Sequence, residues 1–204
     1  HLGQYGINTV ADLAHVKLSV HRALLPGGQL VSNADDAQVV AAMPAMVRPV
    51  WFSLFPNSAQ ILAARAAAMP CGWYEDGWLV LSDGAVTTRL IAARDVPLTL
   101  GGAARYNIEN ALAAGLAARA LGLPDDAIRA TLAAFRSDPA DNPGRANEFS
   151  VNGARVFVDF AHNPHSIAAI TSALAALPAA KRLVLLSHAG DRSDDDIRGL
   201  VSGA

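Results

Sequence analysis

The chain has 204 residues, of which 52% are hydrophobic and 17% charged, so its composition is that of a globular protein and not of a disordered segment. Its formal net charge of -2 supplies no electrostatic surface for tracking the phosphate backbone, which argues against a nucleic-acid partner. The single cysteine, Cys71, excludes an internal disulfide and a thiolate metal cluster and is expected to be a small buried hydrophobic residue. No stretch approaches the ~18 consecutive apolar residues of a membrane span, and we expect a cytoplasmic protein.

The first part of the chain predicts alternating helices and strands. Thr9 can cap a helix that runs to about Leu25. Its buried face is predicted from three- and four-residue spacing to consist of Val10, Leu13, Val16, Val20 and Leu24. Strands are predicted at 29–32 and 50–54, and a helix at 58–69, an order typical of an α/β fold.

The next segment predicts antiparallel hairpins followed by a pair of helices. Short apolar runs at 78–81 and 87–91 are separated from their neighbours by Asp-Gly pairs, which supply the positive φ angles of tight turns. Alanine-rich helices are predicted at 103–121 and 124–135, the second opened by Pro124.

Residues 137–144 are rich in turn-forming and helix-breaking residues, which indicates a linker between two domains. Beyond it the sequence predicts a hairpin (147–151 and 154–159), a helix (164–177), a strand (182–186) and the start of a helix near Ser193. We therefore expect an α/β protein with one domain at 1–140 and a second at 141–204. The chain has no initiator Met and stops without a completed terminal helix, so we expect it to begin and end inside a longer gene.

Four motifs occur in a fixed order along the chain. The first is His1-Leu2-Gly3 with Lys17 sixteen residues after His1, and the second is Asn33-Ala34-Asp35-Asp36. The third is Arg105-Tyr106-Asn107-Ile108-Glu109-Asn110, and the fourth is Asn142-Pro143-Gly144-Arg145 with Asp159-Phe160-Ala161-His162-Asn163-Pro164. In this order and spacing the sequence resembles the Mur ligase superfamily along essentially its whole length, and it is most similar to cyanophycin synthetase-like members.

The resemblance implies a central Mur ligase domain of the P-loop type, followed by the first part of a Rossmann-like C-terminal domain. It implies an enzyme that uses ATP and Mg²⁺ to join a carboxylate to the amine of an amino acid or peptide. The matching histidine, His1, would contact Mg²⁺, and the matching lysine, Lys17, would be carbamylated and support the same metal site. Read alone, His1 is a chain-end residue and Lys17 a solvated helix charge. Asp35 and Asp36 follow a strand as turn residues commonly do, and we leave them out of the metal site.

The resemblance also implies a nucleotide site between the two domains. Asn107 and Asn110 would face adenine, although an asparagine at a helix start is otherwise a capping residue. Arg145 would bind phosphate, with a surface arginine as the alternative. Asp159 and His162 follow a strand, where α/β proteins bind ligands, and would serve the ribose and phosphates; a structural turn with a cap at Asn163 is the alternative.

The Gly190-Asp191-Arg192 sequence lies near the amino-acid pocket in cyanophycin synthetase-like members, so Asp191 and Arg192 are assigned weakly to substrate binding. The same residues also suit a capped helix start. Nothing in the sequence indicates the oligomeric state or identifies the two substrates.

One element of the family pattern is missing. The phosphate-binding loop Gly-x-x-Gly-Lys-[Ser/Thr] belongs upstream of His1, and no Gly-Lys pair occurs in the chain. Without that loop ATP lacks its main anchor, so we expect the piece by itself to be inactive. Two alternatives stay open: a non-catalytic truncated paralogue that acts as a binding module, and a ligase similar to folylpolyglutamate synthase.

Overall fold

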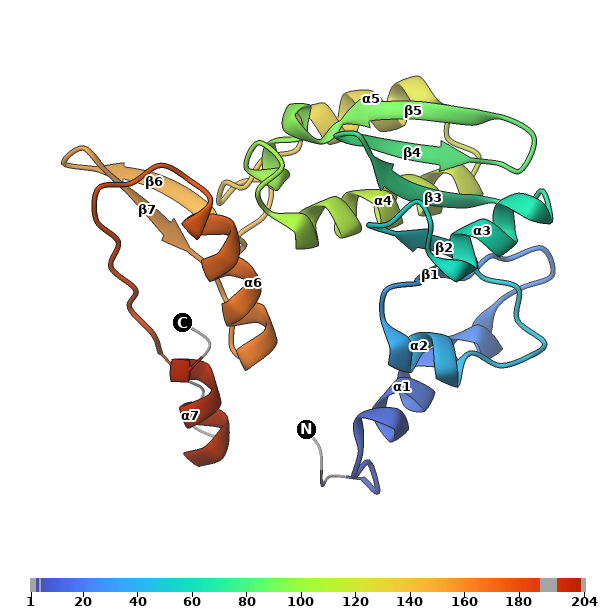
Figure 1. Ribbon diagram of the computed structural model, residues 1–204, viewed down its shortest axis with the longest axis horizontal. Helices are drawn as coiled ribbons and strands as arrows, with labels where there is room; N and C mark the ends of the chain where they lie inside the picture. Colours follow the sequence, from blue (N-terminus) through green and yellow to red (C-terminus); the bar gives the residue numbers. More distant parts are fainter. Residues whose placement is uncertain (1–2, 4, 188–193, 203–204) are drawn as a thin grey trace. The chain divides into compact units, whose positions relative to one another are not determined.

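The computed structural model describes residues 3, 5–187 and 194–202 of the chain (Figure 1). They form two compact units. The first comprises the described residues up to Ala93 together with Ile108–Thr131, and the second comprises Arg94–Asn107 together with the described residues from Leu132 onward. Helix α4 (Arg105–Ala120) belongs with its first turn to the second unit and with the rest to the first. The domain boundary expected at 140 and 141 stays a prediction.

The first unit contains a five-stranded sheet with the strand order β1-β2-β3-β4-β5 (Figure 1). Its strands are β1 (Val31–Asn33), β2 (Val50–Ser53), β3 (Cys71–Glu75), β4 (Trp78–Ser82) and β5 (Thr87–Ala92). The first three strands are parallel, and β3, β4 and β5 pair in antiparallel fashion. Both the expected α/β fold and the expected hairpins are confirmed.

Helix α3 (Ala59–Ala66) covers one face of this sheet. Ile61 and Ala64 of the helix pack in a buried cluster with Cys71, Trp73 and Val80 of β3 and β4. Cys71 is completely buried, and this burial raises the pKa of its thiol. The cysteine is therefore a core residue, as was expected for the single cysteine of the chain.

Helices α4 and α5 (Asp125–Ala134) pack near the opposite side of β3 to β5. A Cβ atom at Gly72 of β3 would approach Leu116 of α4 to 3.1 Å, so the absence of a side chain lets the helix approach the strand closely. Arg119 of α4 donates two hydrogen bonds to the carboxylate of Asp125 at the start of α5. This bidentate pair fixes the turn between the two helices.

Helix α1 (Val10–Leu18) begins as the sequence predicts but buries different residues. Thr9 accepts a hydrogen bond from the backbone N–H of Asp12, whose carboxylate accepts from the Thr9 N–H in return. The side chains of the predicted buried face at Val10 and Val16 are about half exposed, whereas Ala14 and Leu18 are buried.

The prediction of one long amphipathic helix is therefore wrong. The α-helix ends at Leu18 and continues as the 3₁₀ segment η1 (Ser19–Ala23), whose three-residue period turns later apolar residues off the original face. Its helical neighbour, α2 (Ala37–Ala42), has only six residues and is too short to cover a long apolar stripe.

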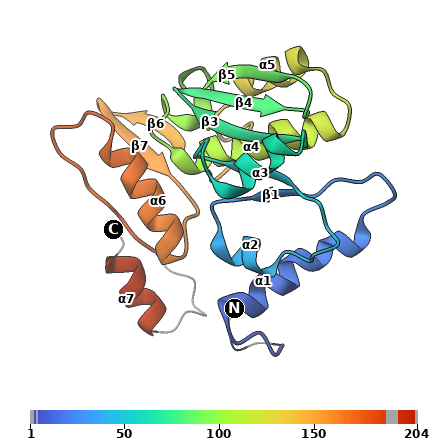
Figure 2. The same ribbon diagram turned by 45° about the vertical axis from the view of Figure 1, so that its right-hand side comes forward.

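The second unit contains the 3₁₀ segment η3 (Pro97–Thr99), the hairpin β6 (Asn147–Val151) and β7 (Ala154–Val158), and helices α6 (Pro164–Ala175) and α7 (Asp194–Ser202) (Figure 2). Asn163 caps α6 by accepting a hydrogen bond from the Ser166 N–H at 2.9 Å. Ile167 and Ile170 of α6 are buried, three residues apart on one face of the helix. The hairpin and the helix follow the sequence prediction.

The strand predicted at 182–186 does not form. Residues 181–187 have no regular secondary structure, and Leu183 and Leu185 are 90% and 95% exposed. A strand exists only where another strand supplies its ladder of hydrogen bonds, and among the described residues of this unit β6 and β7 pair with each other alone. Arg182 instead donates to the carbonyl of Ala175 at the C-terminal end of α6.

None of the helices within the described residues has both the length and the apolar character that crossing a lipid bilayer requires.

Candidate functional site

The residues implied for Mg²⁺ are described only in part. Lys17 lies in the last turn of α1 with its side chain exposed to solvent, and His1 lies outside the described residues. Among the described residues, no three or more histidine, cysteine, aspartate or glutamate side chains are grouped so that they could hold a metal ion. The assignment of His1 and Lys17 to a metal site therefore stays a prediction.

The Asn33-Ala34-Asp35-Asp36 motif follows β1 and forms a hydrogen-bonded turn. Asp35 accepts a hydrogen bond from the Ser53 hydroxyl and another from the Leu54 N–H, each at 2.6 Å. Asp36 caps α2 by accepting from two backbone N–H groups. These bonds give both carboxylates a structural role at the carboxyl ends of β1 and β2.

The two asparagines implied for adenine binding differ in their surroundings. The Asn107 side chain is buried and donates a hydrogen bond to the Leu98 carbonyl at 2.7 Å, whereas Asn110 is exposed one turn further along α4. Because α4 begins at Arg105, Asn107 lies inside the helix and does not cap it. Its bond to Leu98 joins the helix start to the η3 segment.

Three of the implied nucleotide-binding residues lie together in the second unit. The Arg145 loop and the segment after β7 are joined by hydrogen bonds from Ala146 N–H to Asp159 Oδ2 at 2.8 Å and from Phe160 N–H to the Gly144 carbonyl at 2.9 Å. The Arg145 guanidinium lies 5.9 Å from the centre of the Phe160 ring. The centres of the His162 and Phe160 rings are 5.2 Å apart. The structure thus gathers Arg145, Asp159 and His162 around Phe160.

This Phe160 cluster combines a cation, a carboxylate and an imidazole near the N-terminus of α6. Because a carbonyl oxygen can only accept, the 3.0 Å contact between His162 Nδ1 and the Phe160 carbonyl places the ring proton on Nδ1. In the neutral ring Nε2 is then an acceptor. Arg145 is exposed and can meet an anion, and Asp159 keeps its second oxygen, Oδ1, for a hydroxyl group.

Tyr106 is a further polar residue of this unit that the sequence did not single out. Burial raises the pKa of its phenol to about 12, and the nearby Asp159 carboxylate adds to the shift. Among the residues that the structure describes, its buried hydroxyl has no hydrogen-bond partner. The tyrosine is adjacent to Asn107 in the third motif, which is the only signal that the sequence offers for it.

We expect Tyr106→Phe to raise the free energy of unfolding of the chain by about 1 kcal/mol. The substitution removes a buried hydroxyl that loses its hydrogen bonds to water on folding and forms none with the described part of the chain. Urea unfolding measures the change. Tyr5→Phe is the matched control, since Tyr5 is 98% exposed and its substitution should have no effect. A loss of stability in Tyr106→Phe would show that the hydroxyl is bonded after all.

The raised pKa also gives this tyrosine a pH dependence. In the unfolded chain a phenol ionises near pH 10, whereas in the folded chain Tyr106 holds its proton to about 12. Between these values the folded state binds more protons, so the free energy of unfolding falls as the pH rises. This loss should be absent from Tyr106→Phe.

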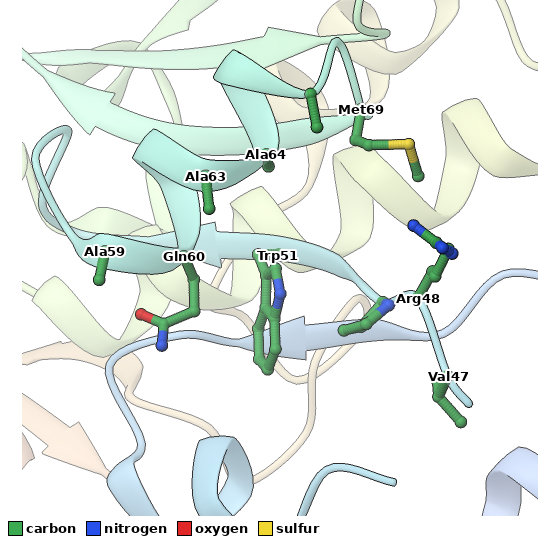
Figure 3. A pocket seen from close by; sticks show the side chains of 10 residues that line it. Val47, Arg48, Trp51, Ala59, Gln60, Ala63, Ala64 and Met69 are labelled. Atoms are coloured by element: carbon green, nitrogen blue, oxygen red, sulfur yellow. The ribbon is translucent and has the colours of Figure 1, made fainter. Parts of the chain in front are cut away.

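The first unit also carries an open apolar groove of about 460 Å³ beside α3 (Figure 3). Trp51 of β2, Ala63 of α3 and Met69 form much of its wall, and Arg48 and Gln60 lie at its edges. None of the described residues implied for nucleotide or metal lines this groove. The remaining site residues, Asp191 and Arg192, lie outside the described residues, and their assignment to substrate stays a prediction.

Comparison with known proteins agrees with the resemblance read from the motifs. Residues 144–204 match the family model of the Mur ligase, glutamate ligase domain. The chain is 36% identical over 197 residues to a cyanophycin synthetase of Trichormus variabilis, an alignment that covers 96% of this chain and 22% of the relative.

The chain is also similar to ligases that are named for UDP-N-acetylmuramate and its derivatives. It is 30% identical over 193 residues to a UDP-N-acetylmuramate–L-alanine ligase of Methylibium petroleiphilum, covering 91% of this chain and 38% of the relative. It is 38% identical over 173 residues to a UDP-N-acetylmuramoylalanine–D-glutamate ligase of Frankia casuarinae, covering 83% and 32%. It thus spans about a fifth of the length of the cyanophycin synthetases and about a third of the length of the shorter ligases. The chain belongs to the Mur ligase superfamily.

Proposed function

We propose that this chain is a portion of an ATP-dependent ligase, similar to cyanophycin synthetase, that joins a carboxylate to the amine of an amino acid or peptide. The observation that carries the proposal is the gathering of Arg145, Asp159 and His162 around Phe160. The match along 96% of this chain but 22% of the relative supports a portion of a longer enzyme. Within it, residues 1–140 are proposed as part of the central domain and 141–204 as part of the C-terminal domain.

The proposed reaction has two steps. A carboxylate oxygen attacks the γ-phosphorus of ATP, the bond to the β-phosphate oxygen breaks, and an acyl phosphate and ADP form. The amine then attacks the acyl carbon, phosphate leaves, and the amine proton passes to solvent or to a base. The products are an amide, ADP and phosphate.

The side chains of the Phe160 cluster suit the nucleotide by their chemistry. Arg145 offers an exposed guanidinium whose planar donors can hold a phosphoryl group. Asp159 Oδ1 can accept a bond from a ribose hydroxyl while Oδ2 stays bonded to Ala146 N–H. His162 Nε2 offers an acceptor beside them. Asn107 and Asn110 are proposed for adenine, and Asp191 and Arg192, more weakly, for the amino-acid substrate.

Mg²⁺ enters the proposal through the family and not through a ligand set in this structure. Among the described residues, no three histidine, cysteine, aspartate or glutamate side chains are grouped so that they could hold the ion. His1 and a carbamylated Lys17 are the residues proposed to hold the ion, which would neutralise charge on the ATP phosphates. An exposed lysine such as Lys17 is accessible to the carbon dioxide that carbamylation needs.

The proposal is tested by comparing the 204-residue chain with the full-length protein. With carboxylate-ended peptides, amino acids and ATP, the full-length protein should release one ADP for each amide formed, and hydroxylamine should trap the acyl phosphate as a hydroxamate. The chain alone should show neither activity, because it contains no Gly-Lys pair of a phosphate-binding loop.

Two results would contradict this proposal. Amide-coupled ADP release by the isolated chain, above the level of a heat-killed sample, would show that the loop is not needed. A full-length protein that binds partners but neither hydrolyses ATP nor forms hydroxamate would favour the binding module over the enzyme.

A further inference from the structure

Arg145 lies between two residues whose backbone is left-handed. Gly144 has a φ of +73° and Ala146 a φ of +49°. Alanine pays on the order of 1 kcal/mol for such a backbone because its Cβ crowds the following carbonyl. A loop that keeps this conformation must therefore be held by its surroundings.

The side chain of Asn147 supplies much of that restraint. It is 3% exposed, and the oxygen and the nitrogen of its side-chain amide are both bonded to the loop. Oδ1 accepts from the Gly144 N–H at 2.6 Å, and Nδ2 donates to the Asn142 carbonyl at 2.8 Å. One buried side chain thus closes the turn from which Arg145 projects.

The segment after β7 holds the same loop from the other side. Asp159 Oδ2 accepts from the Ala146 N–H, and the Phe160 N–H donates to the Gly144 carbonyl. Both neighbours of Arg145 are therefore fixed by hydrogen bonds, while Arg145 itself stays exposed with its guanidinium above the Phe160 ring. The backbone is held, and the charged end of the side chain is left open to a ligand.

We propose that Asn147 is a positioning residue, which holds the Asn142–Arg145 turn so that Arg145 presents its guanidinium at a fixed place beside Asp159 and His162. The inference rests on the proposed function, in which Arg145 binds an ATP phosphate. A guanidinium that is already in place loses little conformational entropy when the phosphate arrives. Asn147 acts through Arg145 and does not touch the nucleotide.

The alternative is that Asn147 only stabilises the fold. The two roles differ in their dependence on Arg145. If Asn147 positions the guanidinium, its substitution should lower activity only while Arg145 is present. If Asn147 only stabilises the fold, its substitution should lower activity by the same factor with or without Arg145.

The experiment is a double-mutant cycle in the full-length ligase, with kcat/KM for ATP as the measured quantity. Asn147→Ala should lower it about 10-fold in the wild-type background, as removal of a supporting hydrogen-bond partner commonly does. In the Arg145→Ala background the same substitution should have little further effect. Asn147→Asp is the second variant, because it can still accept from Gly144 N–H but cannot donate to the Asn142 carbonyl.

Glu148→Ala is the matched control. Glu148 is the next residue of β6, and its exposed carboxylate pairs with Arg155 on β7, so its loss should leave kcat/KM unchanged. Equal losses from Asn147→Ala with and without Arg145 would overturn the positioning role while leaving the proposed function intact. A wild-type protein without ATP-dependent ligation would overturn both.

Discussion

Replacing Lys17 with alanine in the full-length protein, the proposed ligase, is expected to lower amide formation on the order of 100-fold or more. The proposed carbamate gives the lysine stem a negatively charged oxygen donor, which Mg²⁺ accepts as a ligand. An unmodified ammonium carries no lone pair and would be repelled by a divalent cation. Steady-state release of ADP and amide measures the loss.

The sign of the charge at Lys17 can be tested by chemical rescue. Acetate should restore part of the activity of Lys17→Ala by placing a carboxylate in the vacated space, and alkylamines should not. Lys181→Ala is the control, since Lys181 is the only other lysine of the chain and is also exposed. Rescue by amines alone, or a fully active Lys17→Arg variant, would show that the residue acts as a cation.

The second large effect is expected at Arg145. Arg145→Ala should lower kcat/KM for ATP by about 100- to 1,000-fold, the range found when a preorganised donor to a developing negative charge is removed. Arg145→Lys should recover only part of this loss, because an ammonium cannot form the two parallel bonds that a guanidinium makes to a phosphoryl group.

Arg155 offers a matched control for Arg145. It is also an exposed arginine of the second unit, and its guanidinium lies 5.1 Å from the centre of the Phe157 ring. Its charge is paired with Glu148, so Arg155→Ala should leave the ATP dependence unchanged. If Arg145→Ala and Arg155→Ala gave equal losses, the phosphate role of Arg145 would be wrong.

Local chemistry made most of the elements predictable from the sequence. The capping box of Thr9, the hairpin turn at Asp76 and Gly77, and the cap at Asn163 each depend on residues within a few positions of one another. The order of the motifs also carried the family resemblance. Such features depend on residues that are close together in the chain, and long-range packing did not alter them.

Features that depend on distant neighbours were not predictable in the same way. The buried face predicted for the first helix was wrong, since Val10 and Val16 are about half exposed. Periodicity alone does not show which face of a helix a neighbour covers, and the neighbouring helix α2 is short. The prediction of a strand at 182–186 was wrong, because this segment pairs with no strand among the described residues.

The candidate site shows the same division. The sequence by itself determined the residue types, placing Arg145 after a turn and Asp159 at the end of a strand. Only the tertiary structure decided that these two segments lie side by side, since that requires the Ala146–Asp159 and Gly144–Phe160 hydrogen bonds. It also decided that Asn147 is buried and bonded at both ends, because burial is a property of the folded neighbourhood and not of the residue.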